Sequence, residues 1–291
     1  MGFRTIVINE HSKLAYKNNH LTYKSANQQE VISLSEIDLL ILETTDISIT
    51  TALVSKLAEF KITTIFCDGK RLPAASLMPY DGKHDSSLQI QNQINWTNGR
   101  KEQAWLEILS QKIDNQSQFL YAQDFEEKGM AIVALLETLQ LGDPSNREGH
   151  ASRIFFNTLY GNQFSREKVN DINAGLDYGY TLIMSIFARE IVKCGCLTQI
   201  GINHANQFNP FNLASDLMEP FRVLVDEIVY AHIDSTFPKI KRALFSLFGR
   251  TYSYNGSHMY LSNIVSHYVK ASIDYLHGTN GKMPRLTWMK A

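Results

Sequence analysis

The sequence predicts an α+β protein in which a small strand-rich domain, similar to a β-sandwich, precedes an all-α domain. Three observations lead to this fold class. Residues 1–80 carry alternating and β-branched runs, residues 81–88 are polar and rich in turn formers, and apolar residues recur at helical spacing through 89–291. A chain of 291 residues is long enough to give each domain its own core.

The first domain should consist mostly of strands. Six runs have strand character: 5–8, 13–17, 20–24, 31–34, 37–42 and 63–67. Asn18 and Asn19 should form the turn of a hairpin between the second and third runs. One helix is expected over residues 48–60, where Leu53 and Leu57 share a face. We expect this domain to carry little catalytic chemistry.

Two helices of the second domain matter for function. Asp143 before a proline should cap a helix that Gly161 ends, with Glu148 near its start. A longer helix should follow over about 173–195, and Gly175 and Gly179 would let a neighbouring helix pack closely against it. The closing segment 278–288 should be flexible, because Gly, Asn and Pro recur in it.

The composition places the protein among ordinary globular chains. Hydrophobic residues make up 44% and charged residues 20%. Three cysteines, two of them in a C-x-C pair, form neither a disulfide framework nor a C-x-x-C motif, so we expect free thiols in a reducing cytoplasm. An apolar run of the length and position of a signal peptide or membrane span is absent from the sequence, so neither export nor membrane insertion is expected.

The charges are distributed unevenly along the chain. Residues 235–291 contain eight Lys and Arg and only one acid, Asp274, which gives +7; since the whole chain carries −1, the remainder carries −8. A positive region beside acidic residues suits a polyphosphate substrate. Cations interleaved with phenylalanines suit nucleic acid, although a solvated basic face over an aromatic core fits equally well. The candidate DNA contacts are Arg222, Lys239, Lys241, Arg242 and Arg250.

Asp216 and Glu219 are three residues apart, so on a helix their Cβ atoms would lie about 5–6 Å apart on one face. This spacing has two interpretations. In the first, the pair forms an anionic metal site together with His204 in the preceding Asn-rich loop. Alternatively, Asp216 is the N-cap and Glu219 the N3 residue of a capping box, with Pro220 in the first turn.

Glu148 is the other acidic candidate. Its spacing from the apolar stripe of its helix directs the carboxylate toward the buried face, and Gly149 would leave room for a ligand. The alternative is a solvated first-turn acid that interacts with the helix dipole. His150 faces the opposite side and is left out of the site.

Eight segments, in order, resemble the CRISPR-associated adaptation integrase, the nuclease that acquires spacers. In the amino-terminal half they are KLAYKN at 13–18, IDLLILE at 37–43, ISITTAL at 47–53 and IFCD at 65–68. In the carboxyl-terminal half they are REGHA at 147–151, NAGLDYGY at 173–180, IGINH at 200–204 and LASDLMEPFR at 213–222. The Met218-Glu219-Pro220 sequence is most similar to members from type II systems, while Val223 departs from the proline of many relatives.

The resemblance implies a catalytic site in which Glu148, His204 and Glu219 bind Mg²⁺ or Mn²⁺, with Asp216 beside them as either a supporting residue or a direct ligand. It also implies an amino-terminal domain that forms a homodimer, a small ferredoxin-like adaptation subunit as partner, other type II adaptation proteins as further partners, and double-stranded DNA as substrate. The expected reaction is insertion of short DNA into a repeat array by attack of a 3′-hydroxyl.

Two other functions remain open on the sequence. A metal-dependent nuclease would use water in place of the 3′-hydroxyl. A DNA-binding scaffold would use the acidic residues only to cap helices. Because no Ser, Tyr or Cys stands beside a base in the sequence motifs, a covalent enzyme intermediate is not expected in either enzyme.

Overall fold

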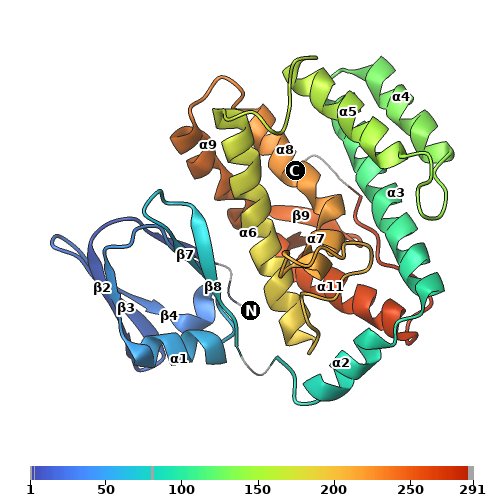
Figure 1. The fold of residues 1–291 in the computed structure, drawn as a ribbon. Helices are drawn as coiled ribbons and strands as arrows, with labels where there is room; N and C mark the ends of the chain where they lie inside the picture. The colour runs from blue at the N-terminus through green and yellow to red at the C-terminus, as the bar shows by residue number, and fades with distance from the viewer. Residues whose placement is uncertain (1, 3, 80–81, 288–291) are drawn as a thin grey trace.

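Two four-stranded sheets form the amino-terminal part of the computed structural model, which describes residues 2, 4–79 and 82–287 (Figure 1). The first sheet has the order β1-β5-β7-β8, with strands Arg4–Ile8, Ile37–Leu42, Thr63–Cys67 and Pro73–Leu77. The second has the order β4-β3-β2-β6, with strands Gln29–Ser33, His20–Lys24, Ser12–Lys17 and Ile47–Ile49. A short 3₁₀ helix, η1 (Leu34–Glu36), precedes β5, and helix α1 (Thr51–Glu59) follows β6.

The six predicted strands are confirmed, and two more are present. Asn18 and Asn19 have φ of 49° and 63°, the left-handed values that a tight hairpin turn uses. Strands β6 and β8 were missed because β6 has three residues and β8 is built from Pro, Ala, Ser and Leu, a composition with weak strand propensity. Helix α1 starts later than predicted, because the Thr50 side chain accepts a hydrogen bond from the Leu53 amide and caps it.

Strand β5 contributes to two separate hydrophobic cores. All six of its residues are buried. Side chains alternate between the faces of a strand, so Leu40 and Leu42 pack in the core between the two sheets, while Leu39 and Ile41 join the core of the helical part. The first sheet therefore lies between the second sheet and the helices.

The remainder of the described chain is helical apart from one hairpin. Its helices are α2 (Ser86–Ile94), α3 (Asn98–Ala122), α4 (Glu126–Glu137), α5 (Arg147–Tyr160), α6 (Asp171–Lys193), α7 (Asn212–Leu217), the 3₁₀ turn η2 (Glu219–Phe221), α8 (Arg222–Tyr230), α9 (Phe237–Leu244), α10 (Ser246–Gly249) and α11 (Leu261–His277). The hairpin of β9 (Thr251–Tyr254) and β10 (Ser257–Tyr260), which precedes α11, was not predicted.

Helix α6 runs through the middle of the helical part and packs against α7, α8, α9 and α11 (Figure 1). The predicted close packing at its small residues is confirmed. A Cβ at Gly175 would lie 2.6 Å from Ile240, and one at Gly179 would lie 2.4 Å from Val225. Side chains at these positions would push α8 and α9 away from α6.

Two segments differ from the prediction. Helix α5 begins at Arg147 and its N-cap is Asn146, while the predicted cap, Asp143, accepts hydrogen bonds from the first two amides of the helix. The closing segment, expected to be flexible, packs on α3: the Leu286 amide donates to Gln111 at 2.8 Å, and the Leu286 side chain is buried. Trp288 and Lys290 lie outside the described residues.

Buried ion pairs join the strand-rich part to the helices. Arg189 on α6 reaches the Asp38 carboxylate at 2.9 Å and also contacts Glu190. Lys241 on α9 lies 2.7 Å from Glu43, which follows β5. Within the described ranges, none of the helices has the length and apolar character that crossing a lipid bilayer requires.

Replacing Arg189 with Met should lower the free energy of unfolding by about 3–5 kcal/mol, because Asp38 would keep a buried charge without its cationic partner. Chemical denaturation measures the change. Arg4→Met is the matched control: Arg4 pairs with Glu36 on the surface, where such a pair contributes roughly 0–1 kcal/mol. Equal effects of the two variants would contradict the importance of the buried pair.

Candidate active site

Glu148 lies in the first turn of α5, held there by two capping side chains. The Asn146 side chain accepts from the Gly149 amide, and the Asp143 carboxylate accepts from the Glu148 amide at 2.9 Å. The helix start is thus capped by other residues, and the Glu148 carboxylate points to α3. A Cβ at Gly149 would lie 2.6 Å from Asn146, so this glycine makes room for the cap.

Glu219 is buried in the 3₁₀ turn η2, between α7 and α8. One carboxylate oxygen accepts a hydrogen bond from Arg222 Nε at 2.9 Å and lies 2.9 Å from Arg222 Nη2. The other oxygen lies 2.7 Å from the Lys112 ammonium. Burial raises the pKa of the Glu219 carboxyl, but the charges of Lys112 and Arg222 outweigh it and hold that pKa at about 2. Glu219 is therefore ionised at every physiological pH.

Lys112 on α3 brings the two glutamates together. Its Nζ lies 2.6 Å from Glu148 Oε1 and 2.7 Å from Glu219 Oε2, and only 11% of its side chain is exposed. Sequence analysis missed this residue. The available signal was its spacing, seven residues after Trp105 and four after Ile108, which places a cation on the buried stripe of α3.

His204 is positioned by the buried carboxylate of Asp216. That carboxylate accepts the backbone amides of Ile202, Asn203 and His204 and lies 2.6 Å from His204 Nδ1. Gly201 lets the loop approach so closely, since a Cβ there would lie 2.7 Å from an Asp216 oxygen. With both Asp216 oxygens engaged, Asp216 supports the imidazole.

The same environment affects the ionisation of His204. The hydrogen bond to Asp216 raises the pKa of the imidazole, burial opposes that rise, and the charges of Glu219 and Glu148 add to it. The Trp105 ring packs edge-on against the imidazole, with ring centroids 5.7 Å apart.

The predicted capping box is wrong. Asp216 lies inside α7, whose N-cap is Phe211, and Glu219 lies in the η2 turn. Neither side chain caps a helix, and the two carboxylates have different partners. The alternative in which these acids serve only as caps is therefore excluded by their contacts.

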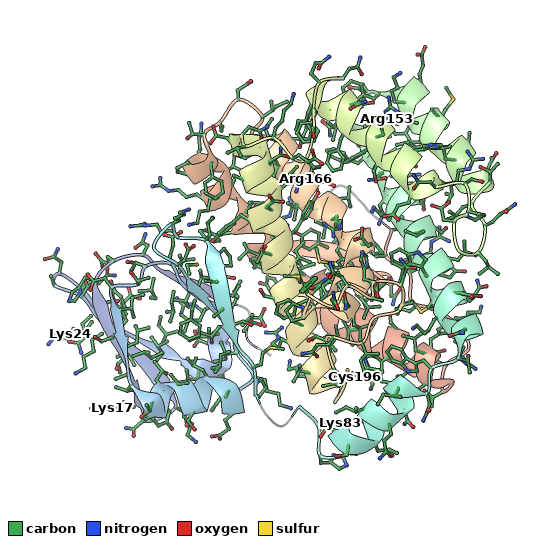
Figure 2. The ribbon with its side chains drawn as sticks, in the orientation of Figure 1. Lys17, Lys24, Lys83, Arg153, Arg166 and Cys196 are labelled. Carbon is green, nitrogen blue, oxygen red and sulfur yellow. The ribbon has the colours of Figure 1, made fainter. Side chains whose placement is uncertain are left out.

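A buried network extends behind Glu219. The Arg222 guanidinium stacks on the Tyr180 ring, 4.6 Å from its centroid, and the Tyr180 hydroxyl donates to Asp226 at 2.5 Å. Arg166, which lies beside α6 (Figure 2), is also near this ring, 5.7 Å from its centroid. Asp226 was missed from the sequence; its signal is the four-residue spacing from Arg222 along one face of α8.

The donor set of the site suits a divalent cation. Two carboxylates face a shared position, and the Asp216 contact at Nδ1 fixes the tautomer that leaves His204 Nε2 as an acceptor when the ring is neutral. Glu219 Oε2 has an ionic contact to Lys112 but no hydrogen bond among the described residues. Among the described residues, no three His, Cys, Asp or Glu side chains are gathered into a ready-made metal site. The two glutamates instead share the Lys112 ammonium.

The five candidate DNA contacts fall into two groups. Arg222, Lys241 and Arg250 are bound to carboxylates, namely those of Glu219, Glu43 and Glu227. Lys239 and Arg242, in contrast, are exposed on α9. The expected basic surface is therefore smaller than the sequence count suggests.

Comparison with known proteins identifies the family. The family model described as "CRISPR associated protein Cas1" matches residues 5–239, which is most of the chain. The chain belongs to the Cas1 family. The family resemblance predicted from the sequence segments is thereby confirmed.

Individual Cas1 relatives match over most of the chain. The "CRISPR-associated endonuclease Cas1" of Neisseria meningitidis serogroup C (strain 8013) is 32% identical over 226 residues, covering 78% of this chain and 74% of that protein. A relative with a similar name from Francisella tularensis subsp. novicida is 22% identical and covers 91% of this chain and 93% of its own.

Solved structures share the fold. A structure titled "Casposase bound to integration product" has a TM-score of 0.77 at 17% identity and covers 97% of this chain and 92% of its own. A chain of a "Cas6-RT-Cas1--Cas2 complex" has a TM-score of 0.75 at 17% identity; it covers 98% of this chain, which spans only 36% of that longer chain. The predicted α+β fold, with a strand-rich part followed by helices, is confirmed.

Asp226→Asn should change how stability depends on pH. Burial raises the pKa of Asp226 from 3.8 to about 7, although the Tyr180 hydrogen bond and nearby cations oppose the rise. Between these values the folded chain keeps a proton that the unfolded chain releases, so stability falls as pH rises, by about 1.4 kcal/mol per pKa unit.

Asparagine carries no such proton, so the unfolding free energy of the variant minus that of the wild type should increase from pH 4 to pH 8. Denaturant titrations across this range measure the difference. A difference that stays constant would contradict the raised pKa of Asp226 in the folded protein.

Proposed function

We propose that this Cas1-family chain is a divalent-metal-dependent DNA integrase of CRISPR adaptation, which joins short DNA to a repeat array. Family membership supports the general role in spacer acquisition. The observation that carries the catalytic part is the convergence of Glu148 and Glu219, from helical segments far apart in the sequence, on the Lys112 ammonium. His204, on the loop before α7, is held by Asp216. A scaffold protein has no need of two acidic side chains converging on one poorly hydrated position.

Glu148, His204 and Glu219 would hold Mg²⁺ or Mn²⁺; the mixture of oxygen and nitrogen ligands suits Mn²⁺ at least as well as Mg²⁺. When bound, the metal supplies Lewis-acid stabilisation of the charge that develops on the scissile phosphate. Asp216 keeps the imidazole in the ligand tautomer, and Arg222 keeps the Glu219 carboxylate oriented.

In the proposed reaction, a donor DNA 3′-hydroxyl oxygen attacks a phosphorus of the repeat. A phosphorus–oxygen bond to the donor forms, and the bond from the same phosphorus to the target 3′ oxygen breaks. The donor hydroxyl loses its proton, and the leaving oxygen gains one. The number of phosphodiester bonds is unchanged, so no external energy source is required.

The proposed partners follow from the relatives. Solved structures with this fold include a Cas6-RT-Cas1--Cas2 complex and a casposase bound to its integration product, so we assign this chain a small Cas2-type subunit and double-stranded DNA. The two sheets are proposed to form the homodimer contact. Lys239 and Arg242 on α9 are the proposed phosphate contacts among the five predicted cations, because both are exposed.

His204→Ala should reduce strand transfer by at least about 100-fold while DNA binding persists, because a proposed metal ligand is lost but the surface cations remain. Joining of a short duplex to a supercoiled plasmid carrying the repeat, with Mn²⁺ and the partner subunit, measures the effect. His150→Ala, an exposed histidine on α5, is the control.

A donor with blocked 3′ ends separates integration from hydrolysis in the same assay. Integration requires the donor hydroxyl, so no joined product should form. Plasmid nicking that continues at an unchanged rate with the blocked donor would instead support a nuclease that uses water. Loss of DNA binding together with strand transfer in His204→Ala would contradict the proposed role of this residue.

The double variant Lys239→Ala/Arg242→Ala should reduce the slope of log affinity against log salt by about 2, since each phosphate contact contributes about 0.9. DNA binding across a salt series measures the slope. Lys17→Ala/Lys24→Ala, which removes two exposed cations of the β2–β3 hairpin (Figure 2), is the control and should leave the slope unchanged. An unchanged slope in the α9 variant would exclude this surface.

A further inference from the structure

We infer that Lys112 is the internal counter-cation of the site and competes with a divalent metal ion for Glu148 and Glu219. The inference rests on the proposed metal site and adds a residue that controls how tightly the site binds its ion. The Lys112 ammonium contacts one oxygen of each glutamate, at 2.6 and 2.7 Å. Both glutamates can contact a single metal ion only if this ammonium moves aside.

The burial of the site explains why a counter-cation is present. The side chains of Glu219 and Lys112 are 4% and 11% exposed, so water screens their charges poorly. Two carboxylates facing a common point repel each other unless a positive charge lies between them. Arg222 contacts only the other oxygen of Glu219, and within the described part of the chain it forms no ion pair with Glu148. Lys112 is thus the cation that holds the two acids together.

The ammonium has two opposite effects on metal binding. It keeps Glu148 turned toward Glu219, which favours an incoming ion because less reordering is needed. It also has to be displaced, which breaks two charge-assisted contacts in a poorly hydrated site. The second effect dominates. Displacing the ammonium breaks its contacts with two carboxylates, whereas the first effect concerns only the rotamers of Glu148, a partly exposed side chain.

A purely structural ion pair would behave differently. If Lys112 served only to connect α3 with α5 and η2, its removal would lower the stability of the protein but would not strengthen metal binding. Stability alone therefore does not distinguish the two roles. The metal affinity does, since only a competitor for the ligands makes affinity rise when it is removed.

The test is Mn²⁺ binding to the wild type, Lys112→Met and Lys112→Gln, measured by calorimetry without DNA. We expect the dissociation constant to fall about tenfold in Lys112→Met, which corresponds to about 1.4 kcal/mol. Mn²⁺ should also raise the melting temperature of this variant more than that of the wild type, because at a given Mn²⁺ concentration a lower dissociation constant stabilises the folded state more. Lys112→Gln keeps a hydrogen-bond donor, and serves if the methionine variant does not fold.

Lys193→Met is the matched control. Lys193 is another largely buried lysine, and its ammonium lies 2.8 Å from Glu190. When Lys193 is replaced, Glu190 still has Arg189 as a cationic partner. The Mn²⁺ dissociation constant of this variant should equal that of the wild type. Adding Glu219→Gln to Lys112→Met should weaken the enhanced binding, which assigns that binding to this site.

The outcomes separate this inference from the proposed function. If the wild type binds no Mn²⁺ and the Lys112 variants do not either, the proposed metal site fails and the inference fails with it. If the wild type binds Mn²⁺ through Glu219 but folded Lys112 variants bind it equally or more weakly, only the competition is overturned. Tighter binding in the Lys112 variants and not in Lys193→Met supports it.

Discussion

A buried carboxylate with two cationic partners organises the helical part of this protein. Glu219 lies where water is largely excluded, and an ionised acid in such a place needs compensation. Arg222 provides one partner from the following helix, while Lys112 provides the other from α3 and also contacts Glu148 at the start of α5. One charge requirement therefore fixes the relative positions of three segments that are far apart in the sequence.

A second buried carboxylate performs the same task for the loop. Asp216 accepts three consecutive backbone amides and the imidazole, so the loop before α7 folds around a single side chain. These donors satisfy the hydrogen-bonding capacity of a fully buried carboxylate that has no Lys or Arg partner among the described residues. The position of His204 depends on this contact more than on any element of secondary structure.

Much of the fold follows from local patterns, whereas the site follows only in part. Alternating strands, the Asn18-Asn19 turn and the long helix around Gly175 and Gly179 were predictable, because each depends on nearby residues. The caps at Asn146 and Thr50 move helix starts by a few residues, and such boundaries are set by side-chain hydrogen bonds that composition does not reveal. Lys112 was missed because its partners are 36 and 107 residues away.

The shared strand β5 has a consequence for how the molecule can be divided. Leu39 and Ile41 fill the helical core while Leu40 and Leu42 fill the other one, so pulling the strand-rich half away would expose apolar surface on both pieces. Chimeras between relatives that exchange the two halves would need compatible side chains on that face of β5. The linker therefore separates the two halves in sequence, whereas the helical hydrophobic core includes side chains from both halves.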